Sequence, residues 1–319
     1  AFLLHDLFHV RPDGIMTIVL PHGVLFRGGE EGTIRKNLIE KNHIDAIIGL
    51  PANIFFGTGI PTIIMVLKQK RDNTDVLIVD ASKGFSKVGK NNVLRACDIK
   101  RIVDVVTSRA TVEKFSRVVS RDEIRANEYN LNIPRYVDSS EKAESWDIFA
   151  SMFGGIPDSE LQELHQYWSA FPNLKEILFA SDDGAYCRLN VPDLKSAVRS
   201  HPSVVSFLNC YEAAFHDFDD VLRAELIDGM QRLNIAKEEA VLSDAIFSRL
   251  DGIPLVDRYG AYQLLDDEWV RIAVDMEIIQ TEGFAATKQV DPNMVSKKKD
   301  GKDQEVQEGW IGHIIPFAL

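Results

Sequence analysis

Four apolar runs stand out in the first part of the chain, at residues 14–23, 44–51, 62–68 and 76–80. They are rich in Ile, Val and Leu and show no regular alternation with polar residues, which is typical of strands covered on both faces of a sheet. Residues 30–42 have helical spacing, with Glu30 and Glu31 in the first turn, where carboxylates are favourable. The pattern predicts an α/β fold with the fourth strand at the edge of the sheet.

Polar segments separate the elements that follow. Residues 81–92 are rich in Lys, Gly and Asn, which predicts a loop, and a helix is expected around residues 99–108. Ser120 and Glu123 have the spacing of a capping box that opens another short helix. After residues 129–137 the strand signals stop.

The second half of the chain has helical periodicity. From about residue 160, apolar residues recur with the spacing of one-sided helical stripes, for example over residues 235–250 and 262–279. The charged residues 296–308 predict a solvated loop or spacer. We therefore expect residues 1–138 to form the second half of a doubly wound, Rossmann-like sheet and residues 139–319 to form a mainly helical region.

Both ends of the chain have an unusual character. The first residue is Ala1 rather than Met, and residues 2–10 already have helical spacing without a capping residue before them. The chain ends in an apolar run, residues 314–319. These features lead us to expect a piece of a longer polypeptide, truncated at both ends.

Composition excludes several classes of protein. No apolar run approaches the roughly 20 residues that cross a bilayer, and no signal peptide is visible. Three dispersed cysteines without paired spacing favour the cytoplasm. A net charge of −12 argues against a nucleic-acid platform over the whole surface, because non-specific DNA affinity comes mainly from Lys and Arg. Any DNA contact is therefore expected to be local or to be made by a partner.

Glycine and histidine patterns offer only weak candidates for nucleotide-binding or metal-binding sites. Gly57 and Gly59 lead into a strand instead of a helix, unlike a dinucleotide-binding loop. Residues 28–32 do open a helix, but Glu30 and Glu31 would repel a phosphate there, so a simple turn explains them better. His5 and His9 have the spacing of a zinc pair without a third ligand, so we expect no metal site. No serine or cysteine has the sequence context of a catalytic nucleophile.

The segment between the second and third runs, residues 53–61 (NIFFGTGIP), is the main candidate. Two adjacent phenylalanines between buried strands predict at least one ring at the rim of the sheet, where it would stack on a base taken out of a duplex. The alternative is that both rings fill the core beneath the loop. For either ring taken singly, burial in the core and exposure at the rim are about equally expected. The end of the first strand would lie at the rim of the ligand crevice of an open α/β sheet, although a simple strand-ending turn is the commoner reading. The candidate residues are Phe55, Phe56, Gly57, Thr58, Gly59 and Pro61 for the base pocket, and Pro21, His22 and Gly23 for the crevice rim.

Four segments resemble, in their order, the modification (M) subunit of type I restriction-modification systems. They are residues 12–29 (PDGIMTIVLPHGVLFRGG), 34–39 (IRKNLI), 44–62 (IDAIIGLPANIFFGTGIPT) and 129–137 (YNLNIPRYV). The resemblance is specific over roughly the first 140 residues and loose over the helical remainder. It implies a DNA adenine-N6 methyltransferase that uses S-adenosylmethionine. It also implies partners: a second M subunit, a specificity subunit, a restriction subunit and DNA.

The same family implies two motifs that this chain lacks. They are a Gly-rich cofactor loop and an Asn-Pro-Pro-Tyr/Phe tetrapeptide, which lie upstream of the matching segment. We therefore expect no catalytic and no cofactor-binding residue here, and an inactive chain on its own. The aromatic loop would border the flipped adenine, and the helical region would dock partners or close around DNA, unless it is an ordinary helical core.

Two other functions remain open from the residues alone. One is a different Rossmann-like enzyme acting on a nucleotide-like small molecule, which an upstream dinucleotide fingerprint would favour. The other is a non-enzymatic assembly module, which stable complex formation by residues 150–319 alone would favour.

Overall fold

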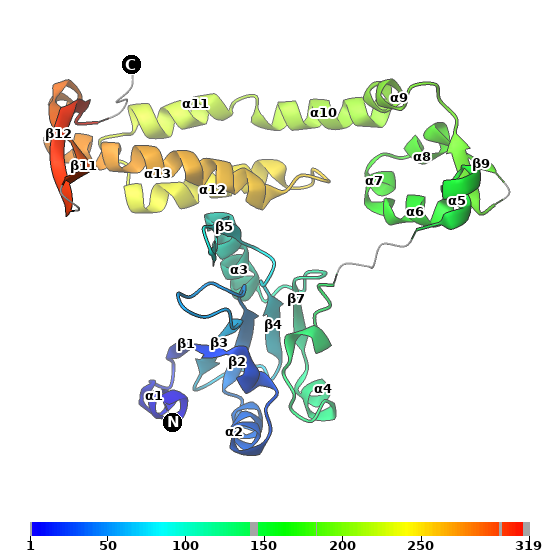
Figure 1. The fold of residues 1–319 in the computed structure, drawn as a ribbon, viewed down its shortest axis with the longest axis horizontal. Helices are drawn as coiled ribbons and strands as arrows, with labels where there is room; N and C mark the ends of the chain where they lie inside the picture. The colour runs from blue at the N-terminus through cyan, green and yellow to red at the C-terminus, as the bar shows by residue number, and fades with distance from the viewer. Residues whose placement is uncertain (1, 141–145, 183, 300–301, 315–319) are drawn as a thin grey trace. The chain divides into compact units, whose positions relative to one another are not determined.

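The computed structural model describes residues 2–140, 146–182, 184–299 and 302–314 (Figure 1). It divides into two compact units, residues 1–144 and 145–319, which are described separately. Most of the terminal apolar run, residues 315–319, lies outside the described residues. None of the helices within the described ranges combines the length and the hydrophobicity required to cross a membrane.

The first unit is built on a five-stranded sheet with the strand order β1-β3-β2-β4-β7. Its strands are β1 (Ile15–Pro21), β2 (Ile44–Gly49), β3 (Thr62–Lys68), β4 (Val76–Asp80) and β7 (Ser116–Val119). β2 and β4 are parallel, and the other neighbouring pairs are antiparallel. The expected α/β class is confirmed, and the sheet is mixed.

The edges of this sheet differ from the prediction. β4 is not an edge strand, because β7 pairs with it along its outer side. The four residues of β7 include Ser116 and Arg117, so its apolar signal in the sequence is weak. At the other edge, no described strand pairs with the outer side of β1. The side chains of β1 alternate, and Ile15 and Val19 are 63% and 48% exposed.

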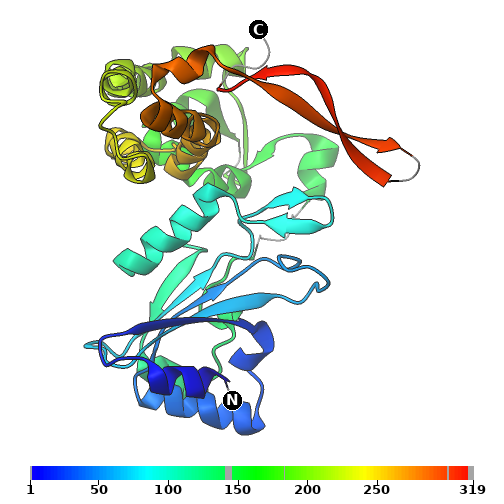
Figure 2. The ribbon, with the colours of Figure 1, turned by 90° about the vertical axis from the view of Figure 1, so that its left-hand side faces the viewer.

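Helices cover both faces of the sheet. α1 (Phe2–His9), α2 (Gly29–Glu40) and α4 (Arg121–Ala126) contribute apolar side chains to the cluster on one face. α3 (Ala96–Ser108) packs on the other face, as Figure 2 shows. β2 lies between these layers and is buried along its whole length, which explains its continuous apolar run.

The expected loop over residues 81–92 is wrong in part. It contains a small hairpin of β5 (Ser86–Val88) and β6 (Asn91–Val93). The predicted helices after it are confirmed as α3 and α4, and the Ser120 hydroxyl accepts a hydrogen bond from the amide of Glu123, as expected for a cap. Two short 3-10 segments, η1 (His22–Leu25) and η2 (Ile133–Arg135), complete the unit.

The second unit is mainly helical. Its helices are α5 (Ile148–Phe153), α6 (Asp158–Glu163), α7 (His165–Ala170), α8 (Leu174–Leu178), α9 (Leu194–Ser200), α10 (Pro202–Phe215), α11 (Phe218–Leu222), η3 (Arg223–Asp228), α12 (Ile235–Leu250), α13 (Arg258–Glu282) and η4 (Phe284–Lys288). It also contains strands that the sequence did not reveal: β8 (Ile156–Pro157), β9 (Phe179–Asp182) and β10 (Tyr186–Leu189). These three form a small sheet in the order β8-β10-β9.

The charged segment 296–308 is not the predicted loop, because most of it lies in an antiparallel hairpin. The hairpin consists of β11 (Val290–Lys299) and β12 (Lys302–Gly312). An ion pair of 2.5 Å joins the Lys297 ammonium to Glu308 across the two strands. Opposite charges on facing strands favour pairing, although the same composition in one segment is typical of a loop.

Candidate functional site

The aromatic loop (residues 53–61) and the β1 rim (Pro21, His22 and Gly23) lie side by side at the edge of the sheet where β1 and β2 end. The amide of His22 donates a hydrogen bond to the carbonyl of Pro61 (3.1 Å), and Pro21 pairs with Thr62 at the start of β3. The amide of Leu50 also donates to Thr62 (2.9 Å), so the loop leaves and re-enters the sheet at one place. The structure thus brings together the two segments that the sequence singled out.

The backbone of the aromatic loop depends on its small residues. Asn53 and Gly57 have positive φ angles of 55° and 78°, a region that glycine adopts without strain. A Cβ atom at Gly59 would lie 3.0 Å from Asn53 Oδ1, which is tighter than ordinary contact. The Thr58 hydroxyl accepts a hydrogen bond from the amide of Ile60 (3.2 Å). These contacts fold the loop into a tight turn that exposes its aromatic end.

Neither phenylalanine of the loop is buried in the core. Phe55 is 43% exposed and Phe56 is 91% exposed, whereas the neighbouring Ile54 packs against the apolar cluster beneath the loop. Three cavities of the first unit, which adjoin Gly28, Asp80 and Ile64, are lined by residues outside the loop. The loop therefore presents a free aromatic face, on which a planar ligand can stack.

Asn92 anchors the loop, a role that could not be predicted from the sequence. Its backbone amide donates to the carbonyl of Asn53 (2.9 Å), and its side-chain amide donates to the carbonyl of Ala52 (2.8 Å). Asn92 is only 7% exposed and belongs to the β5–β6 hairpin. An asparagine in a Lys/Gly/Asn-rich segment resembles any turn residue, so only the fold identifies its partner.

His22 and Asp80 place one imidazole and one carboxylate near the rim. Burial lowers the pKa of His22, and the charge of Asp80 opposes this effect. Asp80 accepts hydrogen bonds from the Ser82 amide (3.0 Å) and the Ser139 hydroxyl (2.5 Å). A histidine with a lowered pKa is neutral at pH 7, so the rim can offer a hydrogen bond without adding positive charge.

Gly23, the last rim residue, permits a close approach of the Arg27 side chain. A Cβ atom there would lie 2.9 Å from the Arg27 guanidinium. The Arg27 side chain therefore uses the space that a larger residue at position 23 would occupy.

The weaker sequence candidates are not assembled into a metal site by the described residues. The rings of His5 and His9 lie 4.8 Å apart on α1, but no group of three or more potential ligands forms in the described part of the chain. Gly28 and Gly29 open α2, with Glu30 and Glu31 in its first turn, as the sequence predicted.

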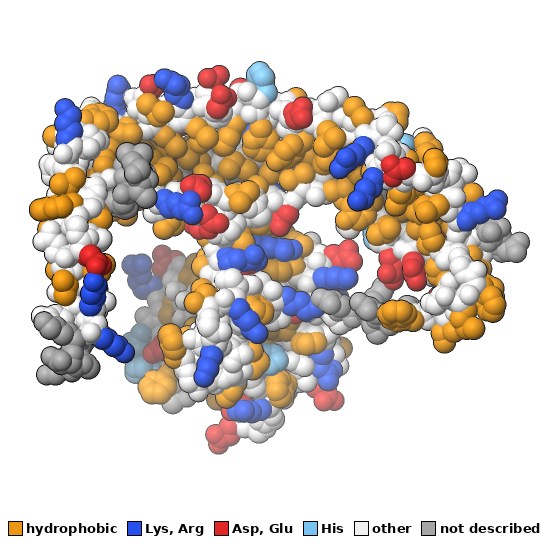
Figure 3. Space-filling view, turned by 45° about the horizontal axis from the view of Figure 1, so that its top comes forward, with side chains coloured by type: hydrophobic (Ala, Val, Ile, Leu, Met, Phe, Trp, Pro, Cys, Tyr) orange, Lys and Arg blue, Asp and Glu red, His pale blue; other side chains and the backbone are white. Residues whose placement is uncertain are grey.

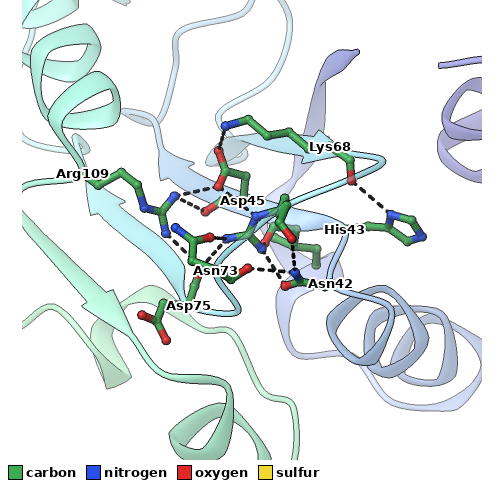
Figure 4. A network of polar contacts seen from close by, with 9 residues as sticks. Asn42, His43, Asp45, Lys68, Asn73, Asp75 and Arg109 are labelled. Carbon is green, nitrogen blue, oxygen red and sulfur yellow. Dashed lines mark hydrogen bonds and ion pairs between the residues drawn. The ribbon is translucent and has the colours of Figure 1, made fainter. Parts of the chain in front are cut away.

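A buried ionic cluster lies at the opposite end of β2 from the aromatic loop (Figure 4). The Asp45 carboxylate, 8% exposed, accepts contacts from Lys68 Nζ (2.6 Å), Arg71 Nε (3.0 Å) and Arg109 Nη1 (2.7 Å). Burial alone would raise the pKa of Asp45, but the hydrogen bond from Lys68 and the charges of the two arginines outweigh it, so the pKa is lowered. Because Arg71 and Arg109 also bond to backbone carbonyls nearby, this cluster fastens β2 to its neighbours.

Known proteins match the unit that carries the aromatic loop. Residues 1–145 match the model of the N-6 DNA methylase family. The methylase subunit of the type I restriction enzyme MpnII from Mycoplasma pneumoniae is 42% identical over 149 residues, which are 46% of this chain and 27% of that protein. The MjaVII methylase subunit from Methanocaldococcus jannaschii is 42% identical over 137 residues, covering 41% and 24% of the two chains.

A solved structure also matches part of the chain. It is a type I restriction-modification methyltransferase subunit from Streptococcus thermophilus, 54% identical, with a TM-score of 0.42 over 43% of this chain and 30% of that chain. The chain spans about a quarter of the length of the curated relatives it matches. Residues 1–145 are thus similar to the N-6 DNA methylase family model and to methylase subunits of type I restriction enzymes.

Proposed function

We propose that this chain is part of the DNA adenine-N6 methyltransferase subunit of a type I restriction-modification system. One observation carries the proposal: the exposed Phe56 ring belongs to the loop that is hydrogen-bonded through Pro61 to His22 at the end of β1, inside the 145 residues that match the N-6 DNA methylase family. An enzyme that modifies a base must take it out of the duplex and hold it against a pocket wall.

In this proposal the aromatic loop holds the extruded adenine. Phe56, or Phe55 beside it, stacks on the purine, and the glycines on both sides of Thr58 let backbone approach its edge. Pro61 and the β1 rim border the same space. The exposure of both rings and the contact between His22 and Pro61 support this arrangement.

The proposed methyl donor is S-adenosylmethionine, and the residues present here do not fit it. Gly57 and Gly59 lead into β3 instead of a helix, and α2 opens with two carboxylates in its first turn. The chain also lacks the Gly-rich cofactor loop and the Asn-Pro-Pro-Tyr/Phe motif. We propose that both motifs belong to polypeptide outside these 319 residues. Without the motifs, the 319-residue chain would bind and orient the base but would not methylate it.

The distribution of charge supports a division of labour between the two units. Basic side chains outnumber acidic ones in residues 1–144, whereas acidic side chains outnumber basic ones in residues 145–319. DNA is bound chiefly through Lys and Arg. We propose that the first unit contacts DNA and that the second unit contacts protein partners.

The surface of the helical unit is consistent with partner binding. Figure 3 shows hydrophobic side chains gathered along its helices. Exposed hydrophobic side chains of this unit include Leu208 on α10 and Leu264, Val270 and Val274 on α13, which are 47%, 70%, 65% and 59% exposed. Exposed apolar surface of this kind marks interaction sites. The proposed partners are the specificity subunit, a second modification subunit and, for cleavage, the restriction subunit.

The proposal is tested by replacing Phe56 and Phe55 singly with Ala in the full-length gene product and measuring methyl transfer to adenine in DNA. Removal of one base–aromatic stack is expected to cost about 1–3 kcal/mol of transition-state binding. We expect this loss at one of the two positions, with unchanged folding by circular dichroism.

Phe8→Ala is the matched control, because Phe8 is 80% exposed on α1 and lies outside the loop. Methylation at the wild-type rate by both loop variants would refute the stacking role. A full-length protein that transfers no methyl group to adenine would refute the proposed function itself.

A further inference from the structure

A cavity of about 510 Å³ lies at the start of α2, apart from the aromatic loop. It is formed by two segments that are distant in sequence, one around Gly28 and Gly29 and the other from Ala126 to Arg135. The amide of Leu131 donates to the carbonyl of Leu25 (2.9 Å) and holds the two segments together. Because α2 begins shortly after the end of β1, the cavity lies near the same edge of the sheet as the aromatic loop.

Arg35 supplies a buried positive charge to this cavity. The residue is 6% exposed, and three of its hydrogen bonds fix the guanidinium: Nε donates to the carbonyl of Tyr129 (2.6 Å), and Nη1 donates to those of Val24 (2.8 Å) and Arg27 (3.0 Å). No described residue accepts a hydrogen bond from Nη2, which lies near Gly32 in the cavity lining. A held guanidinium with one free nitrogen is a preorganised donor for an oxyanion.

Two exposed cations stand at the same cavity. The Lys36 ammonium lies 5.3 Å from the centre of the Tyr129 ring, and Arg135 lines the opposite segment. Neither makes an ion pair with any carboxylate among the residues that the structure describes. Glu128 is the acidic residue in the lining, so positive charge is in excess.

The start of α2 adds backbone donors. Gly28 caps the helix without a side-chain hydrogen bond, and the space next to Gly28 and Gly29 is open. The carboxylates that follow do not line the cavity; Glu31 lies 3.8 Å from Arg27, although its charge also acts on Arg35. Free amides at a helix start bind anions, so they reinforce the three cations.

We propose that this cavity holds a backbone phosphate of DNA, with the exposed ring of Phe26 and the half-buried ring of Tyr129 beside the adjoining sugar. The inference rests on the proposed function, which supplies DNA as the partner. It adds a contact with the DNA backbone near the same edge of the sheet as the base pocket. A phosphodiester carries one delocalised negative charge, which suits a guanidinium, a neighbouring ammonium and free amides.

The test measures DNA binding by the full-length gene product as a function of salt. Arg135→Gln and Lys36→Gln are each expected to weaken binding and to reduce the slope of log K against log salt by about 1, the loss of one phosphate contact. Lys41→Gln is the control, because it removes an exposed lysine at the other end of α2, outside the cavity. Slopes for both cavity variants equal to that of Lys41→Gln would overturn the proposal.

A second measurement uses the 319-residue chain and inorganic phosphate. Nuclear magnetic resonance titration is expected to shift the amide signals of Gly28 and Gly29 in the wild type and much less in Arg135→Gln. Unshifted amides in the wild type would count against the site. If the cavity variants keep their DNA binding but lose binding of the specificity subunit, the phosphate site is also overturned. The cavity would then hold an acidic protein segment.

These outcomes separate the two proposals. If the full-length protein methylates adenine and the slopes do not change, only the phosphate site fails. If it transfers no methyl group but Arg135→Gln still lowers the slope, the phosphate site stands and the methyltransferase proposal fails.

Discussion

Asp45 lies near the amino end of β2, whereas Phe56 lies in the loop that leaves its carboxyl end. The first is a buried charge with three cationic partners, and the second is an apolar ring in water. Each is unfavourable in isolation. The cations around Asp45 account for the first, and the proposed purine would account for the second.

Asp45→Asn is expected to lower the free energy of unfolding of the first unit by about 3–5 kcal/mol, the range found when one partner of a buried ion pair is removed. Arg71 and Arg109 would keep their charges but lose the carboxylate. Urea unfolding followed by circular dichroism measures the change. Asp72→Asn, a nearby residue with an exposed side chain, is the control, and equal stability of the two variants would contradict the structural role of the cluster.

The same carboxylate predicts a dependence of stability on pH. Because the pKa of Asp45 is lowered in the folded state, its contribution is present above the unfolded carboxyl value of about 3.9 and is lost as the pH falls through the folded pKa. The wild type is expected to lose stability over this acidic range more steeply than Asp45→Asn. Parallel stability curves for the two proteins would show that Asp45 does not cause the loss.

At the scale of elements, local patterns predicted the parts of the fold that are continuous in sequence. The apolar runs identified β1 to β4, and the acidic first turn and the capping box located α2 and α4. β7 and the β11–β12 hairpin were missed because their stability comes from partners elsewhere: β4 for β7, and cross-strand charges for the hairpin. Pairing of this kind leaves no periodic signal in one segment.

The site shows the same limit. The sequence singled out the aromatic loop and the β1 rim, because adjacent aromatics between buried strands are unusual. It did not reveal Asn92 or the cavity beside Arg35, which both depend on contacts between distant segments. Long-range hydrogen bonds join residues whose types are ordinary taken singly.

Asn92→Ala is expected to loosen the aromatic loop. The substitution removes the donor to the carbonyl of Ala52 and should cost about 1–3 kcal/mol, the penalty for a buried group left without a partner. Amide hydrogen exchange over residues 53–61 should accelerate. Asn91→Ala, next to it on β6, serves as the control, and equal exchange in the two variants would show that the tether is unimportant.

At the scale of the whole molecule, the two units have separate apolar cores. The clusters around Ile78 and Val79 belong to the first unit, and the cluster around Leu242 belongs to the second. Units with their own cores are expected to unfold independently. The two units also differ in charge, because basic side chains are in excess in the first and acidic side chains in the second.

Leu242→Ala is expected to destabilise only the second unit. Leu242 is fully buried, and removal of such a side chain costs about 2–5 kcal/mol. Scanning calorimetry should show the transition of the helical unit at a lower temperature, with the transition of the first unit unchanged. Ile78→Ala should have the reverse effect, whereas one transition that shifts in both variants would contradict independent unfolding.

The outer side of β1 has a practical consequence. No strand in the described part of the chain pairs with this side, so β1, with the exposed side chains of Ile15 and Val19, is a template on which another polypeptide can add by edge-to-edge pairing. At high concentration the 319-residue chain should therefore self-associate through this strand. A lysine in place of Val19 would place a charge on the template and keep the preparation monodisperse.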